Sequence, residues 1–206
     1  MRGSRACSKQ RACVFAMTIT PVVLEAELAA GRLCCPGCEG PLSPWGFARE
    51  RAVRMLDGVR SVRPRRAYCR SCETTHVILP AWSVPRRRDS AEVIGHALLA
   101  KAQGDGHRPI AARLGRPPAT VRGWLRAFAR RAEPVRRCAA RWAHAVDPAL
   151  APLAPAVSPL GDALEALGIA ATACKLRLGM GASPWELAVA LTGGLLHGQP
   201  RDPPGF

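Results

Sequence analysis

The segments CPGC at residues 35–38 and AYCRSC at residues 67–72 place two Cys-x-x-Cys pairs about thirty residues apart. Each pair turns tightly and presents two thiolates from one side, and two such pairs complete the tetrahedral set of sulfur ligands that Zn²⁺ favours. Asp57-Gly58, a strong hairpin signal, lies between them and would bring the second pair back to the first. We therefore predict a zinc ribbon with one structural Zn²⁺ bound by four ligands: Cys35, Cys38, Cys69 and Cys72.

Other interpretations of these residues stay open at this point. One Cys-x-x-Cys pair could act in redox chemistry, although no thioredoxin-like βαβ pattern accompanies either pair. Cys34 could replace Cys35 with a longer spacing, and His76 could be a ligand through a Cys-x2-Cys-x3-His pattern. A closed four-cysteine site has no open coordination position, so the zinc should be structural and should stabilise a small β unit.

The charge of the chain is concentrated in its middle. Of the formal net charge of +15, residues 49–141 carry 22 Lys and Arg against 7 Asp and Glu, so the flanking segments nearly cancel. Clustered positive charge of this kind repels itself unless a polyanion neutralises it. Double-stranded DNA is the partner that we predict, whereas a merely solvated basic surface is the alternative.

The segment IAARLGRPPATVRGWLRAF, residues 110–128, has the pattern of a helix-turn-helix. Ala111 is the small residue where the helices cross, and Gly115 supplies the positive φ that the turn needs. Pro118 suits the first turn of a helix, although Pro117 stands where a Ser or Thr cap is commoner. An ordinary three-helix core with an arginine-rich surface is the alternative interpretation.

Apolar residues of the second helix should face inward, which leaves a basic face outward. Arginine can bond guanine in the major groove, whereas threonine and turn residues usually contact phosphate. Arginines just before the second cysteine pair should contact phosphate as well. The predicted DNA-binding residues are Arg116, Thr120, Arg122, Gly123, Arg126, Arg130, Arg63, Arg65 and Arg66; Arg131 could extend the phosphate contacts.

The fold class expected from these patterns is α+β, with four consecutive parts. Residues 1–32 should be a disordered leader and a short helix, and residues 33–85 the small β zinc ribbon. A basic linker around Pro85 should lead to a trihelical helix-turn-helix domain over residues 86–133, in which Asp89 caps the first helix. Residues 134–206 are rich in Ala and Pro and should be mostly helical.

We expect the protein in the cytoplasm, where free thiols persist, in association with the nucleoid. No run of 18 apolar residues occurs, so we expect no membrane span. The first residues only faintly resemble a signal peptide, because Thr18, Thr20 and Pro21 interrupt the apolar run. Translation could start at Met1 or at Met17.

Taken in order, CPGC, PWGFAR, LDG, RPRRAYCRSC, THVILPAW, IAARLGRPPATVRGWLR and LTGGLL resemble an uncharacterised bacterial family. This family is a domain of unknown function related to insertion-sequence transposases, whose N-terminal part carries a similar zinc-binding segment and helix-turn-helix. The resemblance covers roughly residues 33–196 and is weak beyond Pro134. It implies DNA recognition by a protein of mobile-element origin, and it supplies no known activity. Besides DNA, we expect a homodimer or a separate transposase as the partner.

Catalysis is not expected of this chain. A transposase with an acidic triad needs carboxylates that hold two Mg²⁺ ions on a larger fold, and the few acidic residues after Pro134 lie in helical patterns. One alternative function is an RNA-binding zinc-ribbon protein. Another is a specificity subunit for a separate transposase, docked through Trp185, Leu187, Leu191 and Leu195, although plain core packing also explains these residues.

Overall fold

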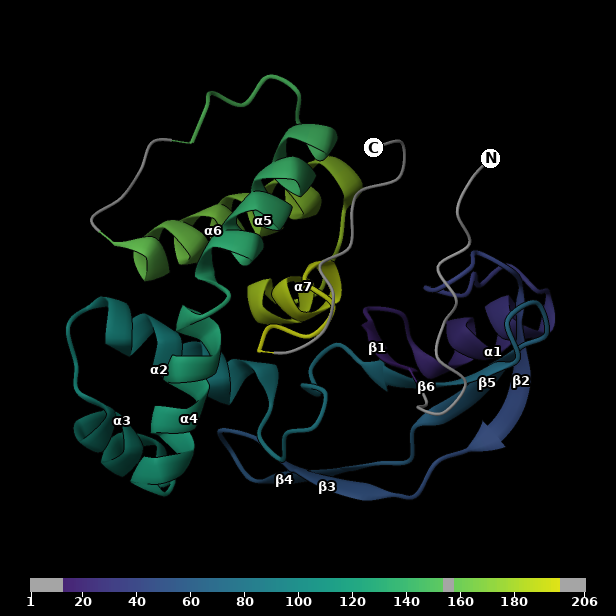
Figure 1. Cartoon of the computed structure of the whole chain (residues 1–206), viewed down its shortest axis with the longest axis horizontal. Coiled ribbons are helices and arrows are strands. Elements are labelled where there is room, and N and C mark those ends of the chain that lie inside the picture. Colours follow the sequence, from purple (N-terminus) through teal and green to yellow (C-terminus); the bar gives the residue numbers. More distant parts are fainter. Residues whose placement is uncertain (1–12, 154–157, 197–206) are drawn as a thin grey trace.

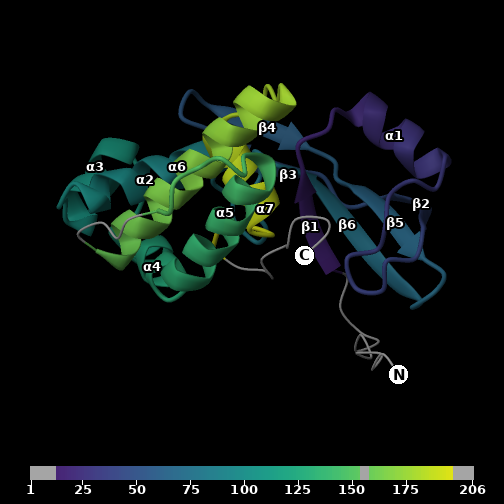
Figure 2. The same cartoon turned by 90° about the horizontal axis from the view of Figure 1, so that it is seen from above.

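The structure, a computed structural model, describes residues 13–153 and 158–196. It is α+β, as predicted, with a sheet and one short helix on one side and a group of helices on the other (Figure 1; Figure 2). A separate β-hairpin runs from the sheet toward the helices along one edge of the molecule.

The sheet has four strands in the order β1-β6-β5-β2. These are β1 (Cys13–Met17), β2 (Leu42–Phe47), β5 (Arg65–Cys69) and β6 (Thr74–Pro80). Strand β1 pairs in parallel with β6, whereas β5 pairs antiparallel with both β6 and β2. Helix α1 (Pro21–Ala29), capped by Thr20, covers one face through Leu24 and Leu28. The opposite face packs Val77 and Leu79 against the helices.

The hairpin predicted at Asp57-Gly58 is confirmed. Strands β3 (Arg51–Arg54) and β4 (Val59–Val62) pair antiparallel and form a sheet of their own. Gly58 has φ 148°, a conformation that favours glycine. The pairing that brings the two cysteine pairs together is the longer-range one between β2 and β5, where Leu42 lies opposite Cys69.

Six helices follow the sheet in the described part of the chain. They are α2 (Ala91–Ala102), α3 (His107–Leu114), α4 (Pro118–Ala129), α5 (Ala132–Val146), α6 (Pro159–Leu178) and α7 (Pro184–Leu191). Helices α2, α3 and α4 pack on one another, α5 packs along α6, and α7 lies between these helices and β1. Glycine at position 95 of α2 allows Trp185 of α7 to approach, because a Cβ there would lie 2.1 Å from its indole ring.

One apolar core joins parts of the chain that the sequence predicted as separate domains. It contains Ala16 and Leu79 of the sheet, Trp124 and Phe128 of α4, and Ala166 of α6. This core crosses the predicted boundaries near residues 85 and 133, while the sheet and α1 enclose a second apolar cluster around Leu42, Ala67 and Ile78. Leu187, Leu191 and Leu195 are buried in the interior, so they are not the docking surface considered above.

Three local predictions are corrected by the structure. Cys13–Met17 belongs to a strand, so the unstructured leader does not extend over these residues, while residues 1–12 lie outside the described range. The predicted linker is packed at its two ends, since Pro85 and Asp89 are buried, whereas Arg86 and Arg88 between them are exposed. The helix that follows is capped by Ser90, whose side chain accepts a hydrogen bond from the backbone of Val93, and not by Asp89.

Candidate metal centre and nucleic-acid interface

The four predicted cysteine ligands come together in one cluster. The sulfur atoms of Cys35, Cys38, Cys69 and Cys72 all lie within 4.8 Å of one another. The Sγ atoms of Cys35 and Cys72 are 3.7 Å apart, and those of Cys38 and Cys69 are 3.4 Å apart. A tetrahedron of sulfurs at about 2.3 Å from a central ion has edges of about 3.8 Å. The cluster therefore has the size of a four-thiolate metal site.

The backbone builds the cluster from two similar turns. In the first, the backbone amides of Glu39 and Cys35 donate to the carbonyls of Cys35 and Gly40, at 2.9 and 2.8 Å. The residue after each pair, Glu39 or Glu73, has a positive φ of 63° or 54°, so both turns close alike. Gly40 lets them approach, because a Cβ there would lie 2.3 Å from the Ser71 hydroxyl.

The environment of the sulfurs is uneven. Cys35 and Cys69 are buried, whereas Cys38 is exposed. Burial raises the pKa of the Cys35 thiol to about 12. Burial also acts to raise the pKa of Cys69, but hydrogen bonds, first from the Cys72 backbone, lower it to about 7. Binding of a metal ion must therefore release protons from these thiols.

The structure places the two other residues considered as metal ligands, Cys34 and His76, outside the four-cysteine cluster. Cys34 is exposed and lies outside the four-cysteine cluster. His76 is also outside it, but its Nε2 atom lies 3.3 Å from Cys35 Sγ. Burial lowers the pKa of His76, so its neutral ring can donate an N–H to a Cys35 thiolate and orient this ligand.

The segment predicted as a helix-turn-helix folds as α3, a turn over residues 115–117, and α4. Gly115 has φ 60° and ψ 41°, the left-handed conformation predicted for the turn. The helix after it begins at Pro118, and Pro117 forms no side-chain cap bond. Val121 and Trp124 pack into the core.

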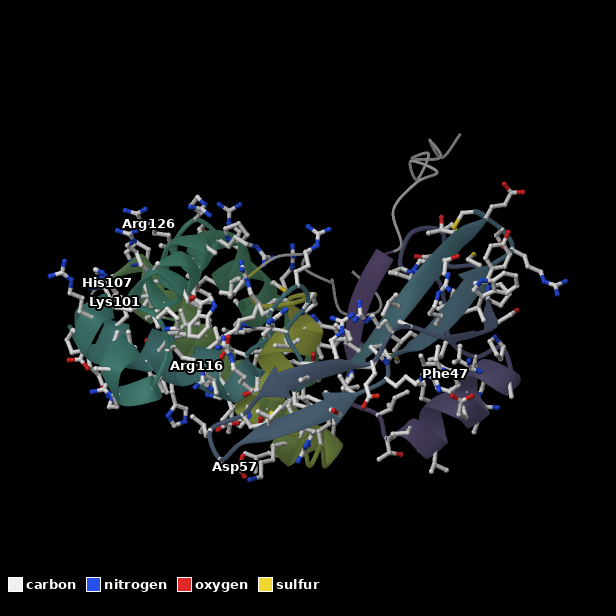
Figure 3. The ribbon with its side chains drawn as sticks, turned by 90° about the horizontal axis from the view of Figure 1, so that it is seen from below. Phe47, Asp57, Lys101, His107, Arg116 and Arg126 are labelled. Atoms are coloured by element: carbon white, nitrogen blue, oxygen red, sulfur yellow. The ribbon has the colours of Figure 1, made fainter. Side chains whose placement is uncertain are left out.

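The outward face of α4 carries the predicted basic residues. Arg122, Gly123, Arg126 and Arg130 are exposed, and Thr120 is half-buried. Figure 3 shows that Arg126 points away from the molecule at the outer end of the helical part. Helix α4 has no acidic residue, and within the described ranges the three arginines form no ion pair. Their charges are therefore available to a polyanion.

Arg116 occupies a different environment from the one predicted. Its Nε atom lies 2.6 Å from Asp89 Oδ1, and its terminal nitrogens donate to the carbonyls of Leu114 and Met55. Only 15% of the side chain is exposed. Figure 3 shows Arg116 between the helices and the hairpin whose turn contains Asp57. The guanidinium is thus engaged inside the protein and is poorly placed to contact a base.

Asp89 is the residue whose role the sequence pattern missed. Its other oxygen lies 2.6 Å from the guanidinium of Arg54 on β3, so one buried carboxylate joins the hairpin to the turn before α4. The backbone of β3 strengthens this junction, because Ser90 N–H donates to the Arg54 carbonyl at 3.0 Å. An aspartate just before a helix has the usual pattern of a helix N-cap. Nothing in the sequence around Asp89 indicates that it pairs with two distant arginines.

The three arginines predicted before the second cysteine pair do not form one surface. Arg63 is exposed, with its guanidinium carbon 5.2 Å from the centre of the Phe47 ring. Arg65 lies over the same ring and pairs with Glu25 of α1 at 2.7 Å. Arg66 is half-buried and points to the other face of the sheet, as alternation along β5 requires.

None of the helices in the described ranges has the length and apolarity that a membrane span requires. Comparison with protein families finds a match over residues 35–114 to a family described as Domain of unknown function (DUF6431). The match covers the cysteine cluster, the hairpin and the chain as far as α3, and is shorter than the expected resemblance. No curated protein matches the chain. No solved structure matches it either. Residues 35–114 of this chain therefore carry a DUF6431 domain, whose function is unknown.

Proposed function

We propose that this protein is a zinc-stabilised DNA-binding protein that reads duplex DNA with α4, the second helix of a helix-turn-helix. The observation that carries the proposal is the row of exposed arginines at positions 122, 126 and 130, one turn apart on a helix with no acidic residue. A helix with such a face suits the major groove, where arginine can bond guanine O6 and N7.

The contrast with the other arginines supports this assignment. Arg113 pairs with Asp105, Arg116 with Asp89, and Arg136 with Glu133, so these cations are neutralised within the protein. The three arginines of the α4 row have no such partner in the described part of the chain. An unneutralised row costs self-repulsion that phosphates would relieve.

Zinc is the ion that we propose for the cysteine cluster. Four thiolates at tetrahedral spacing are the common structural zinc site, and they leave no position for a substrate. The ion would hold the two turns together and so keep β2 and β5 in register. Its role would be structural, and we propose no catalysis by this chain. A mobile-element origin belongs to the same proposal and depends on the sequence resemblance alone.

The test begins with selection of bound sequences from a random duplex pool, followed by competition between the selected site and a scrambled duplex. Arg122→Ala or Arg126→Ala should weaken binding to the selected site by about 1–3 kcal/mol and relax preference at particular base pairs. Arg177→Ala on α6 is the matched control, because this exposed arginine is paired with Asp147, away from α4. It should leave the sequence preference intact.

The salt dependence of the affinity separates phosphate contacts from contacts that read the base sequence. Each lost phosphate contact should reduce the slope of log affinity against log salt by about 0.9. If the Arg122 and Arg126 variants lose equal affinity for selected and scrambled duplexes, α4 binds without reading the sequence. If they bind the selected duplex as tightly as the unaltered protein, the helix-turn-helix assignment is wrong.

A further inference from the structure

We propose that the face of β2 and β5 opposite α1 binds an unpaired nucleotide. The base would stack on Trp45, and the phosphate would contact Arg66. This surface is distinct from α4 and does not depend on the helix-turn-helix function. Trp45 is a large aromatic side chain, yet 52% of it is exposed. It contacts Tyr68, with ring centroids 5.0 Å apart and ring planes 31° apart.

The strand register places these groups on one face. Ser43 lies opposite Tyr68, so Trp45, two residues further along β2, belongs to the same side of the sheet. On β5, Arg66 and Tyr68 alternate with the buried Ala67 and Cys69, which face α1 and the cysteine cluster. Trp45, Tyr68 and Arg66 therefore share the face that points away from α1.

This face is covered only in part. Val77 and Leu79 of β6 pack against the core of the helices on this side of the sheet. Strand β2 is at the edge of the sheet, and the register between β2 and β5 shifts between Pro44 and Phe47. The irregularity lies at Trp45 and Gly46, where Gly46 has φ 76°, so the edge that presents the indole is bent. The indole remains half in solvent at the end of the covered surface.

The chemistry of the face suits a nucleotide. A half-exposed indole resting on a second ring offers a flat surface on which any base can stack, and such stacking is tolerant of sequence. Neither β2 nor β5 contains an acidic residue, and the exposed Arg70 directly follows β5. Positive charge beside stacked aromatics is typical of sites for single-stranded nucleic acid.

The base must be unpaired, because bases inside a duplex already stack on their neighbours and expose only their edges. A second copy of this chain would bring like charges together, since residues 49–141 carry 22 cationic against 7 anionic side chains. Charge complementarity therefore favours a polyanion over self-association at this face.

The experiment uses the full chain with its metal and measures fluorescence anisotropy of labelled 12-nucleotide oligomers of dT and of U. Trp45→Ala should weaken single-strand binding by about 5–150-fold, the effect of losing stacking with one base. Trp45→Phe should retain most of the affinity, and Arg66→Ala should weaken binding and flatten its salt dependence. Leu176→Ala on α6 is the matched control, because this exposed apolar side chain, at 76%, lies away from the sheet.

Circular dichroism and metal content of each variant show that the fold is retained. Weaker binding of the Trp45→Ala and Arg66→Ala variants to the dT oligomer, the U oligomer or both supports the site. The comparison of the two oligomers tells whether DNA or RNA is the source of the base. The proposal is overturned if the unaltered protein binds neither oligomer, or if Trp45→Ala and Arg66→Ala bind like Leu176→Ala. Loss of self-association in Trp45→Ala, with single-strand binding unchanged, would instead assign the face to a second copy.

The two proposals fail separately. The Arg122→Ala and Arg126→Ala variants should lose the selected duplex but keep single-strand binding, whereas Trp45→Ala should do the reverse. If the α4 variants abolish single-strand binding while Trp45→Ala leaves it intact, unpaired nucleotides bind at α4 and the second surface is wrong.

Discussion

Replacement of Asp89 by alanine should destabilise the protein more than replacement of an aspartate in one of the protein's exposed ion pairs. Only 3% of the Asp89 side chain is exposed, and its two oxygens each lie 2.6 Å from an arginine, Arg54 or Arg116. The carboxylate thus joins the β3–β4 hairpin to the turn before α4. Its removal leaves two cations facing one another with no counter-charge.

The magnitude follows from the burial of the two arginines. Removing one partner of a buried ion pair costs about 3–5 kcal/mol, because the remaining charge cannot be hydrated. Arg116, 15% exposed, fits that case, whereas Arg54, 38% exposed, can recover part of its hydration. We therefore expect about 3 kcal/mol for Asp89→Ala, at the lower end of the range. For a chain of 206 residues this corresponds to a decrease in Tm of roughly 6–12 °C.

The assay is thermal and urea unfolding, followed by circular dichroism with zinc present throughout. Asp105→Ala is the control, because Asp105 also pairs with an arginine, Arg113, but at the surface. An exposed pair contributes at most about 1 kcal/mol, so this variant should be close to the unaltered protein. Equal losses in Asp89→Ala and Asp105→Ala would refute the reasoning, because burial would then make no difference to the pair.

Two further predictions concern the metal and the helix packing. Elemental analysis should find about one zinc per chain. Cys38→Ser or Cys72→Ser should lose the zinc, and hydrogen exchange should show that the β2–β5 pairing is lost with it. Full zinc content in either variant would contradict the ligand set. Gly95→Ala should destabilise by at least about 1–3 kcal/mol in urea unfolding, because the added Cβ would meet the Trp185 ring at 2.1 Å. Gly168→Ala on α6, where a Cβ meets nothing within 4 Å, should instead stabilise by up to about 1 kcal/mol, and a similar loss in both variants would contradict the packing argument.

The features that could be predicted from sequence are those set by neighbouring residues. The spacing within each Cys-x-x-Cys pair constrains a short turn, and both turns are present, with all four sulfurs within 4.8 Å. Asp57-Gly58 constrains a hairpin, and Gly115 constrains the turn between α3 and α4 by its left-handed φ. The apolar period of α4 placed Val121, Trp124 and Phe128 inside and Arg122 and Arg126 outside, as observed.

The features that could not be predicted depend on which distant segments meet. Asp89 has the pattern of a helix cap, but burial beside Arg54 and Arg116 makes it the link between hairpin and turn. For the same reason Arg116 is not free to contact a base. Strand β1 was assigned to a leader, because its partner β6 lies some sixty residues further along and parallel pairing has no local signal.

The face that carries Trp45 and Tyr68 likewise combines a feature that the sequence predicts with one that only the tertiary structure determines. Alternation along β5 predicts that Arg66 and Tyr68 share a side, but not which side the helices cover. That cover comes from helices far along the chain, which pack over β6 and leave Trp45 at the edge half in solvent. Local backbone preferences are energies of adjacent residues, whereas the exposure and charge partners of a side chain depend on contacts between segments that the chain brings together only when it folds.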